Sequence, residues 1–289
     1  MRIVKFKGGL GNQMFQYAFG KYIGDLFGGE VYFDCQTNEL PEITKLSADC
    51  KFISEEQAKK FVRLREYRKS SRTKRKLFAM FNSAFNPKYY FEKTREEVDV
   101  SKLKKKAYFD GYWQCWKYLE KNKESLKRDF YPKAGLSEAA QRDVAFVSER
   151  ETVCLGIRLG DYTAEQKHYM VCGADYYRKA IEYCLQHISN PLFYVFSNDI
   201  EGAKAIMAEF AGRADVIYRE EKDVLVNYEE MWVMAACRHA IIPNSTFHWW
   251  AAWLKDGEGH TIVAPGTWFG DGKKIDIVPS GWVKIQENL

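Results

Sequence analysis

Metal-binding and disulfide patterns are missing from this sequence. Its seven cysteines are odd in number, dispersed along the chain and never spaced as Cys-x-x-Cys, which argues against a disulfide framework and a zinc site. No Asp-x-Asp-like carboxylate pair in a credible loop and no histidine cluster offers ligands to a catalytic cation. The sequence therefore predicts a protein that sits in a reducing compartment and works without a metal ion.

Long apolar runs are missing as well. No stretch of about 18 apolar residues occurs, and the first residues lack the apolar core of a signal peptide. We therefore expect a cytoplasmic protein that is at most peripheral to the inner membrane.

Neither sign of charge is in large excess, because 44 basic residues face 39 acidic ones for a net charge of +5. An electrostatic partner must therefore be sought in a local cluster. The clearest cluster is residues 59–76, with ten Lys or Arg and the single acid Glu66. A solvated helix, a peripheral membrane contact and a nucleic-acid site all stay open for it, although we expect no nucleic acid as a partner.

The alternation of strand-like and helix-like segments predicts an α/β fold. A chain of 289 residues suits two domains, which we place at residues 1–145 and 146–289. Each is expected to hold a parallel sheet, with ligands beyond the carboxyl ends of its strands. The expected strands are 2–6, 31–33, 152–157, 192–196, 216–218, 240–242 and 261–264. The expected helices are 12–24, 54–76, 122–130, 175–187, 200–210, 223–237 and 245–254.

Glycines follow the first expected strand, in residues 8–13 (GGLGNQ). Glycine lets a ligand approach the backbone closely, and the N-terminus of the next helix offers N–H groups to an anion or a sugar oxygen. The run has neither the Gly-x-Gly-x-x-Gly order of dinucleotide-binding proteins nor the Lys-Ser/Thr pair of a P-loop. The alternative is a tight turn that packs a helix on a sheet.

A second candidate is residues 156–162 (GIRLGDY), directly after an expected strand. This position puts Arg158 at the carboxyl end of the strand, where an arginine can bind two phosphate oxygens at once. Asp161 either orients that arginine, binds a hydroxyl group or accepts a proton. The alternative is a buried structural pair of Arg158 and Asp161.

Two polar turns follow later strands. Ser197 and Asp199 offer acceptors to a base or to ribose hydroxyls, or else cap the next helix. Asn244, Ser245 and Thr246 precede a helix, where their backbone and hydroxyl groups suit a pyrophosphate. Core packing is the expected role of three tryptophans on that helix, Trp249, Trp250 and Trp253.

Six blocks of the sequence together resemble the bacterial α1,2-fucosyltransferases of glycosyltransferase family 11. They are GGLGNQMFQYAFG, GYWQCWKYL, GIRLGDY, YVFSND, HAIIPNSTFHWWAAWL and VAPGTWF, and they occur in the family's order. The match as a whole runs from residue 3 to about residue 270. The resemblance implies a GT-B-like fold of two Rossmann-type domains with parallel sheets facing a cleft. It also implies that the C-terminal half binds GDP-fucose, that the N-terminal half serves the acceptor, and that no cofactor or metal is needed.

The resemblance assigns roles to individual residues. Arg158 matches the arginine of the family's HxRRxDY block that contacts the donor diphosphate, and Asp161 and Tyr162 match the end of that block. The family's histidine and second arginine are replaced by Gly156 and Leu159, so neither of those side chains can contribute here.

Further contacts are expected on the same basis. Asn12 matches a glycine-loop asparagine that lies close to the transferred sugar and the acceptor oxygen. The other expected donor contacts are Gly9, Gly11, Ser197, Asp199, Asn244, Ser245, Thr246 and Phe247. The expected acceptor contacts are Gln13, Trp113 and Tyr162.

The implied reaction is an inverting transfer of L-fucose from GDP-fucose to the 2-hydroxyl of a terminal β-galactoside. Arg158 would stabilise the leaving GDP, Asn12 would position the hydroxyl, and Asp161 is the alternative base. Transfer of another sugar, another linkage and O-fucosyl transfer to protein remain alternatives.

Overall fold

The chain forms two compact units. The computed structural model describes residues 1–286 except 36–40, 63–71, 160–171, 220–224 and 272–273. Unit 1 comprises Met1–Ala134 and Lys274–Ile277, and unit 2 comprises Gly135–Lys273 and Val278–Leu289. A boundary after residue 145, as expected from the sequence, would cut helix α5 (Glu138–Ser148). This helix packs on α8 (Asn227–Ala236) and therefore belongs entirely to unit 2.

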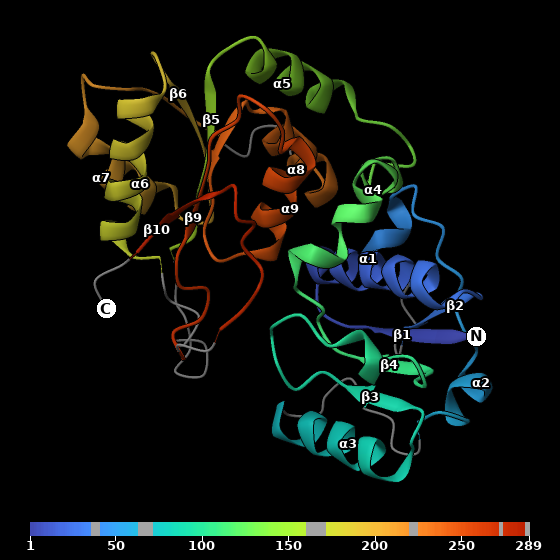
Figure 1. Ribbon diagram of the computed structural model, residues 1–289. Helices are drawn as coiled ribbons and strands as arrows, with labels where there is room; N and C mark the ends of the chain where they lie inside the picture. Colours follow the sequence, from blue (N-terminus) through green and yellow to red (C-terminus); the bar gives the residue numbers. More distant parts are fainter. Residues whose placement is uncertain (36–40, 63–71, 160–171, 220–224, 272–273, 287–289) are drawn as a thin grey trace. The chain divides into compact units, whose positions relative to one another are not determined.

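Unit 1 is built on a parallel sheet with the strand order β2-β1-β4-β3 (Figure 1). Its longest helix, α1 (Leu10–Phe27), starts directly after the glycine loop and buries Met14, Phe15 and Phe19. The strands are β1 (Arg2–Phe6), β2 (Val31–Cys35), β3 (Tyr89–Phe91) and β4 (Tyr108–Asp110). The other helices are α2 (Glu55–Lys59), α3 (Arg72–Phe85) and α4 (Lys123–Asp129), with 3-10 turns η1 (Glu42–Lys45), η2 (Val100–Lys102), η3 (Trp116–Tyr118) and η4 (Glu120–Asn122).

Unit 2 holds a six-stranded parallel sheet with the order β10-β9-β8-β5-β6-β7. Figure 1 shows α6 and α7 on one face of this sheet and α8 and α9 on the other. The strands are β5 (Thr152–Ile157), β6 (Leu192–Ser197), β7 (Asp215–Tyr218), β8 (His239–Ile241), β9 (Ile262–Pro265) and β10 (Val283–Ile285). The remaining helices are α6 (Ala174–His187), α7 (Ile200–Met207), η6 (Ala208–Phe210) and α9 (Thr246–Lys255).

The strand order of unit 2 reverses at its centre. From β5 the chain adds β6 and β7 on one side, and then β8, β9 and β10 on the other. This is the order of a doubly wound nucleotide-binding fold, in which ligands bind outside the carboxyl ends of the strands where the order reverses. All six residues of β5 are buried, as expected for a central strand covered by helices on both faces.

Most of the expected elements are confirmed, but the single helix over residues 54–76 is wrong. Helix α2 ends at Lys59, and the chain then turns so that Val62 is buried beside Ile3 and Tyr108. Burial of this apolar residue outweighs the helical propensity of the lysines before it. The helix α3 begins only at Arg72.

All seven cysteines are free thiols. No helix among the described residues combines the length and hydropathy needed to cross a bilayer. The expected core role of Trp249, Trp250 and Trp253 is confirmed, because these three rings are at most 4% exposed.

Candidate functional site

The carboxyl ends of β5 and β8 are neighbours at the reversal point of the unit 2 sheet. Arg158 directly follows β5 and is exposed, and its backbone N–H donates to the hydroxyl of Tyr177 over 3.0 Å. Among the described residues, no ion pair or hydrogen bond engages its guanidinium group. The exposed Arg158 thus places a positive side chain where ligands of this fold bind.

The turn after β8 leads into α9, whose N-terminus carries no side-chain cap. Ser245 is the N-cap residue, but its hydroxyl accepts no hydrogen bond from the first turn, and that turn contains no acidic residue. Helix α7, by contrast, is capped by Asp199. The free N–H groups and the dipole of α9 thus favour a bound anion near Ser245, Thr246 and Phe247.

His248 occupies the space above Gly156. A β-carbon at Gly156 would overlap Cδ2 of the His248 ring and lie 2.8 Å from its Nε2 and 3.0 Å from Cδ of Pro243. Both ring nitrogens of His248 are shielded from water and have no hydrogen-bond partner in the described part of the chain. Burial, together with the nearby charge of Arg158, lowers the pKa of His248 to about 4, so the ring is neutral at pH 7.

The polar groups that follow β6 are mostly engaged within their own turn. The carboxylate of Asp199 accepts from the N–H of Gly202 over 2.9 Å, and the hydroxyl of Ser197 accepts from the N–H of Asp199 over 3.0 Å. Asp199 therefore caps helix α7, which is the alternative role that the sequence left open for it. The amide of Asn244 likewise donates to the carbonyl of Trp268 over 3.1 Å.

Two expected site residues, Asp161 and Tyr162, lie outside the described residues. Their expected roles as base and acceptor contact stay predictions. The segment before them ends at Leu159, whose carbonyl accepts a hydrogen bond from the side-chain amide of Asn198.

In unit 1 the glycine loop joins β1 to α1. Gly8 adopts a φ of +79°, where a side chain would be strained, and a β-carbon there would also collide with Asn12. A β-carbon at Gly9 would meet nothing within 4 Å, so a ligand has room to approach the backbone there. However, the N–H of Leu10 donates to the carboxylate of Glu42 over 3.2 Å. That negative charge disfavours a diphosphate at the expected contacts Gly9 and Gly11.

Asn12 and Gln13 differ in how they are held. The Oδ1 atom of Asn12 accepts from the side chain of Gln114 over 2.8 Å, and Asn12 is partly exposed. Gln13 is buried, donates to the carbonyl of Gly8 over 3.0 Å and accepts from the N–H of Ile43 over 3.0 Å. Gln13 therefore braces the loop and has little left to offer an acceptor, whereas Asn12 keeps its amide NH2 group at the surface.

Trp113 is a core residue, which corrects the expectation that its ring contacts the acceptor. Its side chain is fully buried and stacks on Phe19 with the ring centres 3.8 Å apart. The adjacent Tyr112 is 43% exposed instead, with the ammonium group of Lys7 4.5 Å from the centre of its ring. An exposed aromatic ring with a polar edge is suited to a sugar, and no pattern in the sequence singled out Tyr112.

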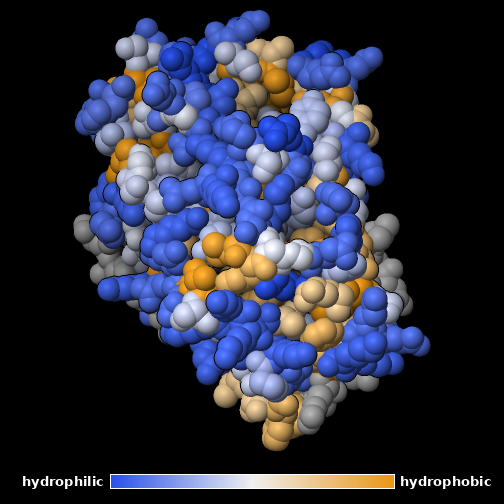
Figure 2. All heavy atoms as spheres, turned by 45° about the vertical axis from the view of Figure 1, so that its right-hand side comes forward, coloured by the Kyte–Doolittle hydropathy of each residue, from blue (hydrophilic) through white to orange (hydrophobic). Residues whose placement is uncertain are grey.

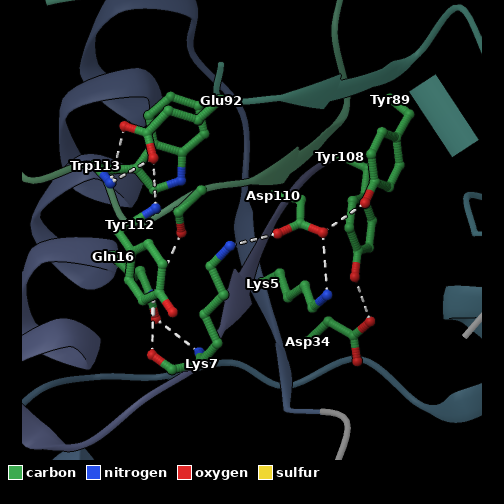
Figure 3. A network of polar contacts seen from close by, with 11 residues as sticks. Lys5, Lys7, Gln16, Asp34, Tyr89, Glu92, Tyr108, Asp110, Tyr112 and Trp113 are labelled. Carbon is green, nitrogen blue, oxygen red and sulfur yellow. Dashed lines mark hydrogen bonds and ion pairs between the residues drawn. The ribbon is translucent and has the colours of Figure 1, made fainter. Parts of the chain in front are cut away.

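A network of charged and polar side chains connects three strands of unit 1 (Figure 3). Asp110, the last residue of β4, accepts from Lys5 over 3.0 Å, from Lys7 over 2.8 Å and from the hydroxyl of Tyr89 over 2.6 Å. Burial opposes ionisation of Asp110, but the charges of Lys7 and Lys5 lower its pKa below the usual range. The network fixes β1, β3 and β4 to one another and places Lys7 at its edge.

Glu92 follows β3 and shapes the turn that carries Tyr112. Its carboxylate accepts from the N–H of Tyr112 over 2.6 Å and from the N–H of Trp113 over 3.1 Å. Burial raises the pKa of Glu92 to about 7, although these hydrogen bonds and the charge of Lys7 act in the opposite direction. Trp113 adopts a φ of 57°, which the two hydrogen bonds stabilise.

Comparison with known proteins gives the class of this protein. The family model of glycosyl transferase family 11 matches residues 1–286. The chain is 30% identical to an Escherichia coli alpha-1,2-colitosyltransferase, with 99% of both chains covered. It is 26% identical to human galactoside alpha-(1,2)-fucosyltransferase 1, over 51% of this chain and 43% of that protein.

The fold comparison agrees with this class. The structure of an Arabidopsis thaliana FUT1 variant in complex with GDP matches with a TM-score of 0.50 and 13% identity, over 90% of this chain and 69% of that one. The protein is a glycosyltransferase with two parallel-sheet α/β domains of the GT-B type. The chain belongs to glycosyl transferase family 11.

Proposed function

We propose that the protein transfers L-fucose from GDP-fucose to the 2-hydroxyl of a terminal β-galactoside, with inversion at the anomeric carbon. The observation that carries this proposal is the position of Arg158 beside the uncapped N-terminus of α9, at the reversal point of the unit 2 sheet. Both features supply positive potential and N–H donors, which a departing diphosphate requires. The α1,2 linkage in the names of its relatives supports the product linkage.

The reaction is a single displacement. The acceptor oxygen forms a bond to the anomeric carbon, the bond from that carbon to the β-phosphate oxygen breaks, and GDP leaves with the electron pair while the hydroxyl loses its proton. Arg158 binds the phosphate oxygens as negative charge develops on them. Since the leaving group is stabilised by this side chain and by backbone N–H groups, we propose that transfer needs no metal ion.

Unit 1 supplies the acceptor side in this proposal. The hydrogen bond from Gln114 holds the oxygen of the Asn12 amide, so its nitrogen is the atom left to donate to a sugar oxygen. The exposed ring of Tyr112 offers an apolar surface to a galactoside. Asp161 remains the proposed base, because a carboxylate can accept the proton of the attacking hydroxyl.

A second donor follows from the relative that transfers colitose. That protein matches the chain over its whole length, and colitose is L-fucose without its 3-hydroxyl group. A site that hydrogen-bonds the 3-hydroxyl would reject GDP-colitose strongly, because a buried polar group would then lose its partner. GDP-colitose is therefore the competing donor for the same reaction.

The test is an assay of the purified protein in EDTA with GDP-fucose or GDP-colitose and a panel of β-galactosides. Release of GDP and the linkage of the product are both measured. Acceptor-dependent release with GDP-fucose and an α1,2 product supports the proposal. Turnover with GDP-colitose and not with GDP-fucose would show that colitose is the transferred sugar. Loss of turnover in EDTA would contradict the proposal that no metal ion is needed.

A further inference from the structure

The helix α3 exposes an apolar surface. Of the nine large apolar or aromatic side chains that are exposed in the described part of the chain, four lie on this one helix. Leu77 is 57% exposed, Met80 51%, Phe81 39% and Phe85 55%. Figure 2 shows hydrophobic atoms at the lower end of the view, the level at which Figure 1 places α3.

Three of these four side chains lie on the face that points away from the sheet, and Phe85 lies at the edge of that face. Ala79 and Asn82 are the buried residues of α3, and α3 packs against β3. With the periodicity of an α-helix, Leu77, Met80 and Phe81 point away from that pair, and Phe85 lies at the edge of the exposed face. The rings of Phe81 and Phe85 lie 4.4 Å apart and form a continuous apolar surface. A helix on the surface of a water-soluble protein normally turns its apolar side chains toward the core and its polar side chains toward the solvent.

Positive charge borders the apolar stripe. Lys74 and Lys76 are exposed on the same helix, and the sequence from residue 59 to residue 76 has ten basic residues against one acid. A second run, residues 102–106 (KLKKK), adjoins the other end of the helix, because Lys106 donates to the carbonyl of Pro87 over 2.8 Å. In that run Lys104 and Lys105 are exposed.

We propose that α3 docks unit 1 on an anionic lipid surface. Large apolar side chains on one face of a basic helix are the pattern of helices that lie in the interface of a bilayer. The apolar side chains would enter the boundary between headgroups and acyl chains, while the lysines at both ends of the stripe face anionic headgroups. Charge complementarity selects a lipid surface over a second copy of this chain, because two such basic faces would repel each other.

The experiment measures binding of the full chain to vesicles of phosphatidylcholine with and without phosphatidylglycerol, by co-sedimentation over a range of salt concentrations. One variant combines Lys76→Glu, Lys104→Glu and Lys105→Glu, and a second combines Phe81→Ser and Phe85→Ser. The control for the lysine variant combines Lys45→Glu, Lys121→Glu and Lys133→Glu. The control for the phenylalanine variant combines Leu26→Ser and Tyr131→Ser. The control residues are also exposed and lie outside α3 and the lysine run 102–106.

We expect binding only to vesicles with phosphatidylglycerol, and weaker binding at higher salt. Each lysine near an anionic surface contributes about fivefold to affinity, so the loss of three positive charges alone weakens binding by on the order of 100-fold, and the three new carboxylates weaken it further. The double phenylalanine variant loses at least about tenfold. Both controls keep most of the affinity, and circular dichroism and the thermal midpoint check that every variant is folded.

Three outcomes overturn the proposal. Binding that ignores phosphatidylglycerol, or equal losses in the variants and their controls, would remove α3 from the contact. A dimer in light scattering that Phe81→Ser with Phe85→Ser converts to a monomer would assign the stripe to a second copy of the chain. These results are separate from the donor assay, since soluble acceptors report transfer without any membrane.

Discussion

Replacing Gly156 by alanine tests the packing at the centre of the proposed donor site. The added methyl group would overlap the ring of His248 and come within 3.0 Å of Pro243. Extra volume in a packed site usually costs about 1–3 kcal/mol. For a domain of this size each kcal/mol lowers the melting temperature by about 2–4 °C, so we expect a loss of about 2–12 °C. The ring of His248 must also move, which shifts its neighbour Arg158.

The second half of this prediction is a rescue. With His248→Ser, the space above Gly156 is vacated, and Gly156→Ala is then accommodated. The double variant should recover most of the melting temperature, with a coupling of at least about 1 kcal/mol in the double-mutant cycle. Gly281→Ala is the matched control, because a β-carbon there meets nothing within 4 Å. Strictly additive effects of the two changes would refute the idea that the residues compete for one space.

Three further predictions concern the remaining site residues. Arg158→Ala should lower the rate of transfer by on the order of 100-fold or more, with an unchanged melting temperature. Arg158→Lys should recover only part of that rate. Full activity of the alanine variant would show that Arg158 takes no part in the reaction. Burial lowers the pKa of His248 to about 4, so between about pH 6.5 and pH 4 the unfolded chain binds a proton that the folded chain does not. Urea titrations should therefore show a loss of up to about 3 kcal/mol in the free energy of unfolding as the pH falls through this range. His248→Ser should flatten this pH profile, and an unchanged slope in that variant would contradict the prediction. Trp113→Ala should lower the free energy of unfolding by about 3–5 kcal/mol. Tyr112→Ala should leave stability nearly unchanged and raise the KM for the acceptor. The opposite pattern would show that the two rings have been assigned to the wrong roles.

The sequence was sufficient for the central strands of unit 2 but not for β3 and β4. β5 and β6 are runs of six residues with almost continuous burial, a pattern that is visible in one dimension. β3 and β4 have only three residues each, and their positions depend on pairing with each other and with β1. Such pairing joins segments far apart in the chain, which no local pattern encodes.

The residues of the candidate site could likewise be predicted only in part. The position of Arg158 after a buried strand could be predicted, because a strand and the turn that follows it are local features. The choice between Tyr112 and Trp113 could not be predicted, because the turn that buries one ring and exposes the other depends on two hydrogen bonds. Glu92, about 20 positions away, accepts both from the backbone N–H groups of the turn. The contact of Gly156 in β5 with His248 in α9 was equally hidden.

The contact of Glu42 with the N–H of Leu10 has a consequence for how the two units share the substrates. Each unit presents a long helix that starts directly after a strand, and each helix start could in principle attract an anion. In unit 1 a carboxylate of the protein already occupies that start, whereas in unit 2 the start of α9 has neither a cap nor an acid. In the proposed function, we therefore expect the diphosphate of the donor to bind at the start of α9, and the start of α1 to be left to an uncharged sugar.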